Sequence, residues 1–199
     1  MHNGLCNLFE IFSFIFNNKR ILKEGTWGAD KPFMRLFSDD LHDYVCELLK
    51  RDDGENYVVK CKTGAMGRWS YTPYCVILSS KYNINYSPSS GMYPAYLISI
   101  DNEEIYLTYM LGVGSRYERT LRRVADAIVQ SFPLEGFSTD YKSLNFGKDI
   151  HKYAFAVVWY KRYTSSSLPS EEVLEFDFNK VMKYHREFGE DIYGIVKNN

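Results

Sequence analysis

Two apolar segments interrupted by glycine decide the fold of this chain. Residues 58–78 read VVKCKTGAMGRWSYTPYCVIL, and residues 90–114 read SGMYPAYLISIDNEEIYLTYMLGVG. Alternation of apolar and polar side chains, with many β-branched and aromatic residues, is typical of strands. We therefore predict strands over 57–62, 73–78, 93–100 and 104–110. The last two are expected to form a hairpin through Asp101, Asn102 and Glu103.

Helical periodicity flanks these strands. Apolar residues spaced at 3, 4 and 7 predict a helix from an N-cap at Ser38 to about residue 51, and another over 118–131. A third helix is predicted after Pro169, and the N-terminal run over 5–16 is predicted to be a packed helix, with a partner-docking helix as the alternative. The β-prone run over 153–159 predicts one more strand. The fold class is therefore α+β, with a curved, mainly antiparallel sheet and flanking helices.

The overall composition suits one domain with a local binding surface. A chain of 199 residues can bury a sizeable core, so we expect residues 1–199 to form a single domain with a helical part over 1–56. The net charge of -1 argues against nonspecific polyanion binding over the whole surface but leaves room for a local basic patch. Aromatic residues make up 17% of the chain, which fits either a β-rich core or a stacking surface.

Motifs for cofactors and metals are missing from the sequence. The cysteines form no C-x-x-C pair, so we predict no zinc site and reduced thiols in a cytoplasmic protein. The apolar run over 5–16 is too short to span a bilayer, so no membrane association is expected. No phosphate-loop string G-x-x-x-x-G-K-[ST] occurs, and no nucleotide or other cofactor is predicted.

No catalytic constellation is visible either. The string Asp177-Phe178-Asn179-Lys180 resembles a nuclease motif only loosely, because Asn179 stands at an acidic position, and we interpret it as part of a surface helix. The histidines have no nucleophile or acid at a diagnostic spacing, and each is interpreted as solvated or packed. We therefore predict a binding module with no catalytic residue. The alternatives are a stand-alone metal-dependent endonuclease and a protein-interaction module.

The basic residues suggest what such a module binds. A flexible turn over 64–67 is followed by a cation and several aromatic rings, a mixture that suits gripping a phosphate chain and stacking a planar group. If the basic residues near these segments gather on one face, they would neutralise several phosphates and make binding weaken with added salt. The cations concerned are Lys60, Lys62, Arg68, Arg116, Arg119, Lys148 and Lys152.

Three blocks in one order carry a family resemblance. They read VKCKTGAMGRWSYTPY at 59–74, SGMYPAYLIS with IYLTYMLGV at 90–113, and KYAFAVVWYKRYTSSSLPSEEVLEFDFNKVMKYH at 152–185. This pattern, over about 57–184, resembles the N-terminal DNA-recognition domain of McrB, the specificity subunit of modification-dependent restriction systems. The resemblance implies an α+β domain that binds duplex DNA and flips a modified base, by default 5-methylcytosine, into an aromatic pocket. It also implies two partners, a GTP-driven AAA+ motor in the same or an associated chain and an McrC-like nuclease.

The resemblance also assigns residues to the pocket and to the DNA backbone. The pocket walls of the family correspond to Met66 in the glycine turn, Tyr74 after the proline, Leu97 in G-x-Y-P-x-x-L and Phe146 ahead of the late strand. Met66 replaces an aromatic ring of the family, so N4-methylcytosine, hydroxymethylcytosine and N6-methyladenine stay open beside 5-methylcytosine. The residues expected to hold phosphates are Lys62, Arg68, Arg116 and Lys148.

Overall fold

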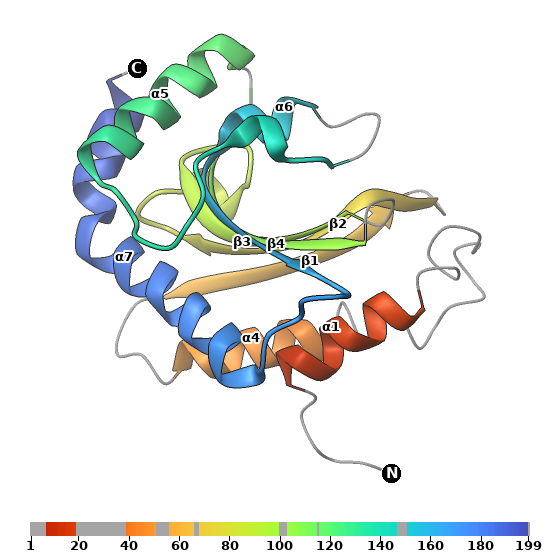
Figure 1. The fold of residues 1–199 in the computed structure, drawn as a ribbon. Coiled ribbons are helices and arrows are strands. Elements are labelled where there is room, and N and C mark those ends of the chain that lie inside the picture. Colours follow the sequence, from red (N-terminus) through yellow and green to blue (C-terminus); the bar gives the residue numbers. More distant parts are fainter. Residues whose placement is uncertain are drawn as a thin grey trace.

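The centre of the molecule is one antiparallel sheet (Figure 1). The computed structural model describes residues 7–18, 39–50, 56–65, 68–99, 103–114, 116–146 and 151–198. Its five strands follow the chain order β1-β2-β3-β4-β5, and each pairs with the next. The strands are β1 Tyr57–Ala65, β2 Arg68–Ser79, β3 Met92–Ser99, β4 Glu104–Leu111 and β5 Val157–Thr164. This confirms the predicted α+β fold class and the four strands expected over 57–110.

The register of the strands divides the side chains between two faces. Residues directly opposite each other in an antiparallel pair point to the same side of the sheet. Tyr74 stands opposite Leu97, and Leu97 stands opposite Tyr106, so these three share a face. We call it the upper face, as it is oriented in Figure 1, and the opposite side, which carries Cys75 and Tyr96, the lower face.

Helices cover the lower face and build most of the core there. Helices α1 (Leu8–Asn17) and α4 (Leu41–Lys50) lie beneath the sheet, and α7 (Glu171–Lys197) runs along its side (Figure 1). The fully buried ring of Tyr96 shows the packing, because it meets Phe12 of α1 edge-on at 5.4 Å and stacks parallel to Phe178 of α7 at 6.2 Å. Such aromatic pairs add to the stabilisation from apolar burial.

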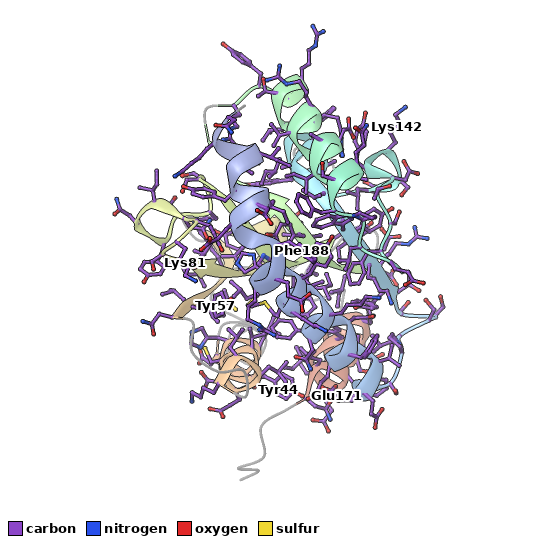
Figure 2. All side chains as sticks on the ribbon, turned by 90° about the vertical axis from the view of Figure 1, so that its left-hand side faces the viewer. Tyr44, Tyr57, Lys81, Lys142, Glu171 and Phe188 are labelled. Carbon is purple, nitrogen blue, oxygen red and sulfur yellow. The ribbon has the colours of Figure 1, made fainter. Side chains whose placement is uncertain are left out.

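One carboxylate holds the lower helices together. Glu171, in the first turn of α7, accepts hydrogen bonds from the backbone N–H groups of Leu8 (3.2 Å) and Phe9 (2.6 Å), which begin α1. It also accepts from the Tyr44 hydroxyl of α4 at 2.6 Å, and Tyr44 and Glu171 lie together at the base of the molecule in Figure 2. A carboxylate at a helix N-terminus satisfies unpaired donors and complements the helix dipole. Glu171 therefore fixes α1 and α4 against α7.

Two helices and one 3-10 turn lie above or beside the upper face. They are α5 (Glu118–Ser131), α6 (His151–Ala156) and a single 3-10 turn, η3 (Tyr141–Ser143). The bounds of α5 agree with the helix predicted over 118–131. The strand predicted over 153–159 is wrong in its first half, because residues up to Ala156 belong to α6. Tertiary packing outweighs the local β-propensity there: α6 contacts α5, and the ring of Phe155 lies 5.4 Å from that of Tyr141.

Asp177 is buried, in contrast to its interpretation as part of a surface helix. Asp177 does lie in α7, but it is only 1% exposed and faces the lower side of the sheet. Its carboxylate accepts from Lys161 Nζ at 2.7 Å and from the Tyr163 hydroxyl at 3.1 Å, both on β5. Pairing with a cation and a hydroxyl compensates for the loss of water around a buried carboxylate. Asp177 is thus a packed link between α7 and β5.

Candidate functional site

A cavity of about 260 Å³ lies on the upper face. Strand β2, strand β3, the end of β4, the loop before β3 and helix α6 all contribute to it. Its volume is slightly below the range of about 300–1,000 Å³ that is usual for small-molecule sites, so it suits one planar ring better than a larger ligand. The lining residues are Thr72, Tyr74, Val76, Pro88, Ser89, Tyr93, Leu97, Met110, Val113 and Tyr153.

The strand pairing places two of the expected pocket residues side by side. Tyr74 of β2 and Leu97 of β3 are direct register partners and both line the cavity. Tyr93 and Met110 are register partners one step further along the sheet and line it as well. The period-2 alternation of strands brings all four to the same face. The floor of the cavity therefore follows directly from the β2-β3-β4 register.

Glycines allow the loop before β3 to form a wall of the cavity. Gly91 has a φ of +67°, and a β-carbon there would lie 1.7 Å from the Tyr82 carbonyl oxygen. A β-carbon on Gly112 would lie 2.4 Å from the backbone of Ser90, and the Gly112 N–H donates to the Gly91 carbonyl at 2.8 Å. Only glycine tolerates such contacts and such a φ without strain. This close approach sets Pro88 against the cavity.

Hydroxyl groups supply the polar side chains of the cavity lining. Three are already bonded within the protein: Thr72 Oγ1 donates to Phe146 O (3.0 Å), Tyr93 to Pro88 O (2.9 Å), and Ser89 Oγ meets Ser87 Oγ (2.7 Å). The hydroxyls of Tyr74 and Tyr153 make no hydrogen bond with another residue of the described ranges. Burial, and secondarily Tyr153, raises the pKa of Tyr74, so its hydroxyl stays neutral at physiological pH. A neutral phenol can donate or accept a hydrogen bond from a bound ring.

The free edge of the sheet brings cations next to the cavity. Lys62 of β1 stands opposite Tyr74, and Lys60 stands opposite Val76, so both lysines belong to the upper face. Both side chains are exposed, and Lys60 Nζ donates to the Tyr86 carbonyl at 2.6 Å. Lys62 forms no ion pair with any residue that the structure describes. An anionic group beside the cavity would find this lysine without displacing a partner.

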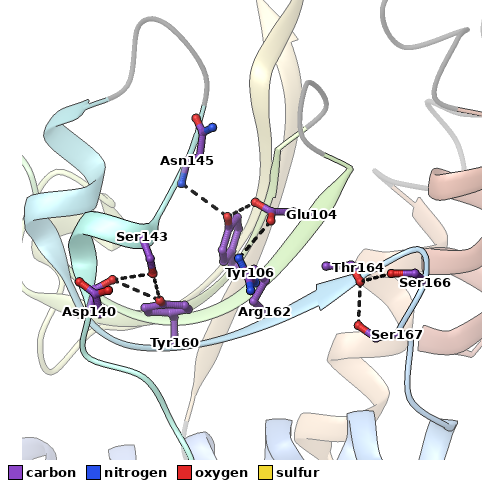
Figure 3. Close-up of polar contacts among 10 residues, drawn as sticks. All are labelled: Glu104, Tyr106, Asp140, Ser143, Asn145, Tyr160, Arg162, Thr164, Ser166 and Ser167. Carbon is purple, nitrogen blue, oxygen red and sulfur yellow. Dashed lines mark hydrogen bonds and ion pairs between the residues drawn. The ribbon is translucent and has the colours of Figure 1, made fainter.

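Phe146, expected to form a pocket wall, lies beside the cavity. It is 4% exposed, and its ring packs edge-on against Tyr106 at 5.2 Å, while its carbonyl accepts the Thr72 hydroxyl. Figure 3 shows how the segment before it is fixed to the sheet: the Asn145 N–H donates to the Tyr106 hydroxyl, which is bonded to Glu104. The lining residue from this part of the chain is instead Tyr153 of α6. Sequence reasoning missed it because residues 153–156 were predicted to be a strand.

The expected phosphate-binding residues are only partly visible. The Arg116 guanidinium donates from Nη2 to the Val196 carbonyl at 2.8 Å and so caps the end of α7. Met66 and Lys148 lie outside the described residues, and so does the side chain of Arg68. Of these predicted residues, the structure therefore brings Tyr74, Leu97 and Lys62 together on one face, with Phe146 just behind.

A metal site needs clustered ligands, and a membrane span needs a long apolar helix. Among the described residues, no group of three or more His, Cys, Asp and Glu side chains is arranged to hold a metal ion. Within the same ranges, no helix is both long and apolar enough to cross a membrane. The buried His185 is packed and shares a hydrogen bond of 2.8 Å with the Tyr109 hydroxyl.

A curved antiparallel sheet with a ring-lined cavity on one face and lysines on the adjoining edge defines an α+β domain with a candidate binding surface. Residues 18–190 match the family described as MrcB-like, N-terminal domain, and the chain belongs to this family. The match confirms the resemblance to the McrB N-terminal DNA-recognition domain and gives the chain a role in DNA binding within modification-dependent restriction. No curated protein matches the chain significantly.

Proposed function

We propose that the domain recognises a modified base in duplex DNA by flipping it into the cavity on the upper face. The observation that carries this proposal is the register that joins Tyr74, Leu97 and Lys62: a ring and an apolar wall line the cavity, and a cation with no described partner stands beside them. The modified base is 5-methylcytosine by family resemblance. A base in the cavity and a phosphate at Lys62 would belong to the same stretch of DNA.

The aromatic walls offset the free energy of base flipping. Extruding a base from the duplex costs a few kcal/mol of unstacking. Stacking on aromatic side chains returns about 1–3 kcal/mol per base, as measured by alanine substitution. Three tyrosines line the cavity, namely Tyr74, Tyr93 and Tyr153. The hydroxyls of Tyr74 and Tyr153 can add hydrogen bonds to the base edge. The cavity therefore has the means to hold an extruded base.

Apolar side chains give the cavity a preference for methyl groups. Leu97, Met110 and Val76 contribute apolar surface to the lining. A fully buried methyl contributes about 0.8 kcal/mol, which corresponds to roughly fourfold discrimination between a methylated and an unmodified base. Met66 would complete the pocket and Phe146 would support it from behind. Larger selectivity would come from shape exclusion in the cavity or from the assembly of several such domains on DNA.

The family resemblance assigns the contacts with the DNA backbone to four cations. Lys62 holds a phosphate beside the flipped base, together with Arg68 and Lys148. Arg116 is the fourth cation of this set; its Nη2 donates to Val196 and its Nη1 is buried, so its guanidinium would have to leave this position to reach a phosphate. These contacts supply affinity that is independent of sequence and falls with salt.

In this function the domain performs no chemistry of its own, and it works without a cofactor. A GTP-driven AAA+ motor and an McrC-like nuclease act on the DNA that the domain has marked, in the cytoplasm. Incubation of the purified chain with plasmid and Mg²⁺ separates this function from a stand-alone endonuclease. We expect the plasmid to remain intact, and cleavage without added subunits would favour the endonuclease.

The direct test is a binding titration of otherwise identical duplexes, one with a central 5-methylcytosine and one unmodified, at two salt concentrations. We expect about fourfold tighter binding of the methylated duplex and weaker binding of both at the higher salt. Equal affinity for the two duplexes would reject the proposal that the domain recognises a modified base. Affinity that does not change with salt would reject the phosphate contacts.

A further inference from the structure

A second hollow, of about 920 Å³, runs along helix α5. Its walls are Tyr141 of η3 and Phe155 of α6, and its α5 side carries both basic and acidic side chains. We call it the α5 groove. The charged residues that line it are Glu118, Arg119, Arg122, Arg123 and Asp126. Arg119 is one of the cations that the sequence suggested for phosphate binding, and the other four were not assigned to the pocket or to the DNA backbone.

Arg122 is a buried cation that is fixed by hydrogen bonds in the wall of the α5 groove. Only 8% of it is exposed, and its Nε donates to Asp126 at 2.8 Å while Nη1 donates to the Val157 carbonyl at 3.1 Å. Its guanidinium also lies 4.6 Å from the centre of the Tyr141 ring. Nη2 has no hydrogen bond to another residue of the described ranges. The side chain is thus held rigidly with donors left for a ligand, which reduces the entropy lost on binding.

Two further arginines leave the charge of the α5 groove positive. Arg119 and Arg123 are exposed one helical turn apart, and neither pairs with an acidic residue in the described part of the chain. The opposing acids are Asp126, which is paired with Arg122, and Glu118. Two unpaired arginines beside a fixed guanidinium fit an anion with several oxygens, and phosphate is one of the groups that arginine binds in this way.

Helix α6 places this groove next to the cavity. Tyr153 of α6 lines the cavity and Phe155 of the same helix lines the groove, so one helix is the wall between them. A helix is about 10–12 Å wide, and a duplex rises 3.4 Å per base pair, which places the groove about three base pairs from a base held in the cavity.

We propose that the α5 groove binds the phosphodiester backbone of the same duplex, about three base pairs from the flipped nucleotide. The proposal rests on the DNA-reading function proposed above, because that function places a duplex at α6. In it, Arg119 and Arg123 each neutralise one phosphate and Arg122 orients the strand between them. The groove increases affinity for any duplex and does not distinguish modified from unmodified bases.

The test is the double variant Arg119→Gln/Arg123→Gln, which removes two charges and keeps helix-forming side chains and the packed Arg122. Binding of the methylated and unmodified duplexes is titrated between 50 and 200 mM salt. Each lost phosphate contact lowers the slope of log affinity against log salt by about 0.9, so the slope falls by about 1.8. Over that fourfold change in salt, the wild-type protein then loses about 12-fold more affinity than the variant. The ratio between the two duplexes is expected to stay unchanged.

The matched control is Lys50→Gln/Lys183→Gln, which removes two charges from α4 and α7, where both lysines are well exposed. Its salt slope should equal that of the wild type. The proposal would be overturned if the groove variant kept the wild-type salt slope, or if the control variant lost as much of the slope as the groove variant. Either result would point to another occupant of the α5 groove, such as an acidic protein segment. Failure of the proposed function looks different, because then the wild-type protein itself shows no preference for the methylated duplex.

Discussion

Replacing Tyr74 by alanine tests the cavity most directly. Tyr74 is half-buried on β2, opposite Leu97, and its ring is one of three tyrosine rings that line the cavity. The substitution removes this wall and leaves Tyr93 and Tyr153 in place. We therefore expect a loss near the lower end of the range for a stacking residue, about 1–1.5 kcal/mol, or five- to twelvefold weaker binding of a methylated duplex.

The same variant should also lose discrimination. A methyl group contributes about 0.8 kcal/mol only where the surrounding walls exclude water, and an open wall admits water. The fourfold preference for the methylated duplex is then expected to fall toward one. Tyr74→Phe separates the ring from the hydroxyl: it should keep the preference and lose at most the roughly 0.5–1.5 kcal/mol of one hydrogen bond.

The assay is fluorescence anisotropy with labelled methylated and unmodified duplexes at one fixed salt concentration, with a thermal melt to verify folding. Tyr184→Ala is the control, because Tyr184 is also a half-buried tyrosine but lies on α7, where its ring packs edge-on against Trp159 at 5.3 Å. This control should bind both duplexes like the wild type. Unchanged affinity and an unchanged ratio in a folded Tyr74→Ala protein would refute the assignment of the cavity to the modified base.

Four other changes have defined outcomes. Lys62→Gln should lower the slope of log affinity against log salt by about 0.9, and an unaltered slope would exclude a phosphate contact there. Glu171→Gln should lower the free energy of unfolding by about 1–3 kcal/mol in urea titrations, because a charged acceptor at the start of α1 is lost; an unshifted midpoint would contradict this role. Gly91→Ala should destabilise the protein by at least about 1 kcal/mol and weaken duplex binding, because the loop that forms a wall of the cavity must move away from it. An unchanged melting temperature would argue against backbone strain at this position. Burial raises the pKa of Tyr96 and Tyr163 above the unfolded value of about 10. The contribution of these two residues to the free energy of unfolding is therefore complete below pH 10, and above pH 10 it falls by up to about 1.4 kcal/mol per pH unit for each residue. Equal urea midpoints at pH 8 and pH 11 would contradict this.

Local patterns in the sequence were sufficient to predict those helices and strands whose tertiary packing agrees with their local propensity. Helix α5 has its apolar residues at Leu121, Val124, Ala125 and Ile128, and all four are buried in the structure. The β3-β4 hairpin combines β-prone residues with a short polar connection, and the two strands pair over their whole length. In both cases one periodicity fits one face, so no distant residue is needed to decide between helix and strand.

Elements decided by distant contacts were not predictable in this way. The run over 153–159 has strong β-propensity throughout, yet Phe155 packs on Tyr141 and the chain stays helical up to Ala156. The burial of Asp177 depends on Lys161, which lies 16 residues earlier on another element. Sequence periodicity predicts an exposed carboxylate at such a helical position, because the partner that allows its burial lies on a strand. Pairwise contacts of this kind leave no periodic signal in the sequence.

The candidate site shows the same division. The Gly, Pro and aromatic strings that carry the family resemblance identified Tyr74 and Leu97, which lie on adjacent strands and line one cavity. The other walls come from Pro88 and Ser89, directly before the second of those strings, and from Tyr153, inside the third, but no pattern in the sequence assigned these residues to the pocket. Their arrival at the cavity depends on Gly91 and on the helical form of residues 151–156. The role of all these residues in holding a base remains the proposal to be tested.

The lysines of β1 have a consequence for the solubility of the protein. An open sheet has two outer strands with unpaired backbone groups, which invite pairing with a second molecule. On β5 this is partly prevented, because Ser138 forms a bridge with Tyr160. On β1, the exposed Lys60 and Lys62 place like charges where an incoming copy would have to align. Natural sheets use lysine in this position to discourage aggregation, so replacing both lysines with valine should promote self-association of the protein.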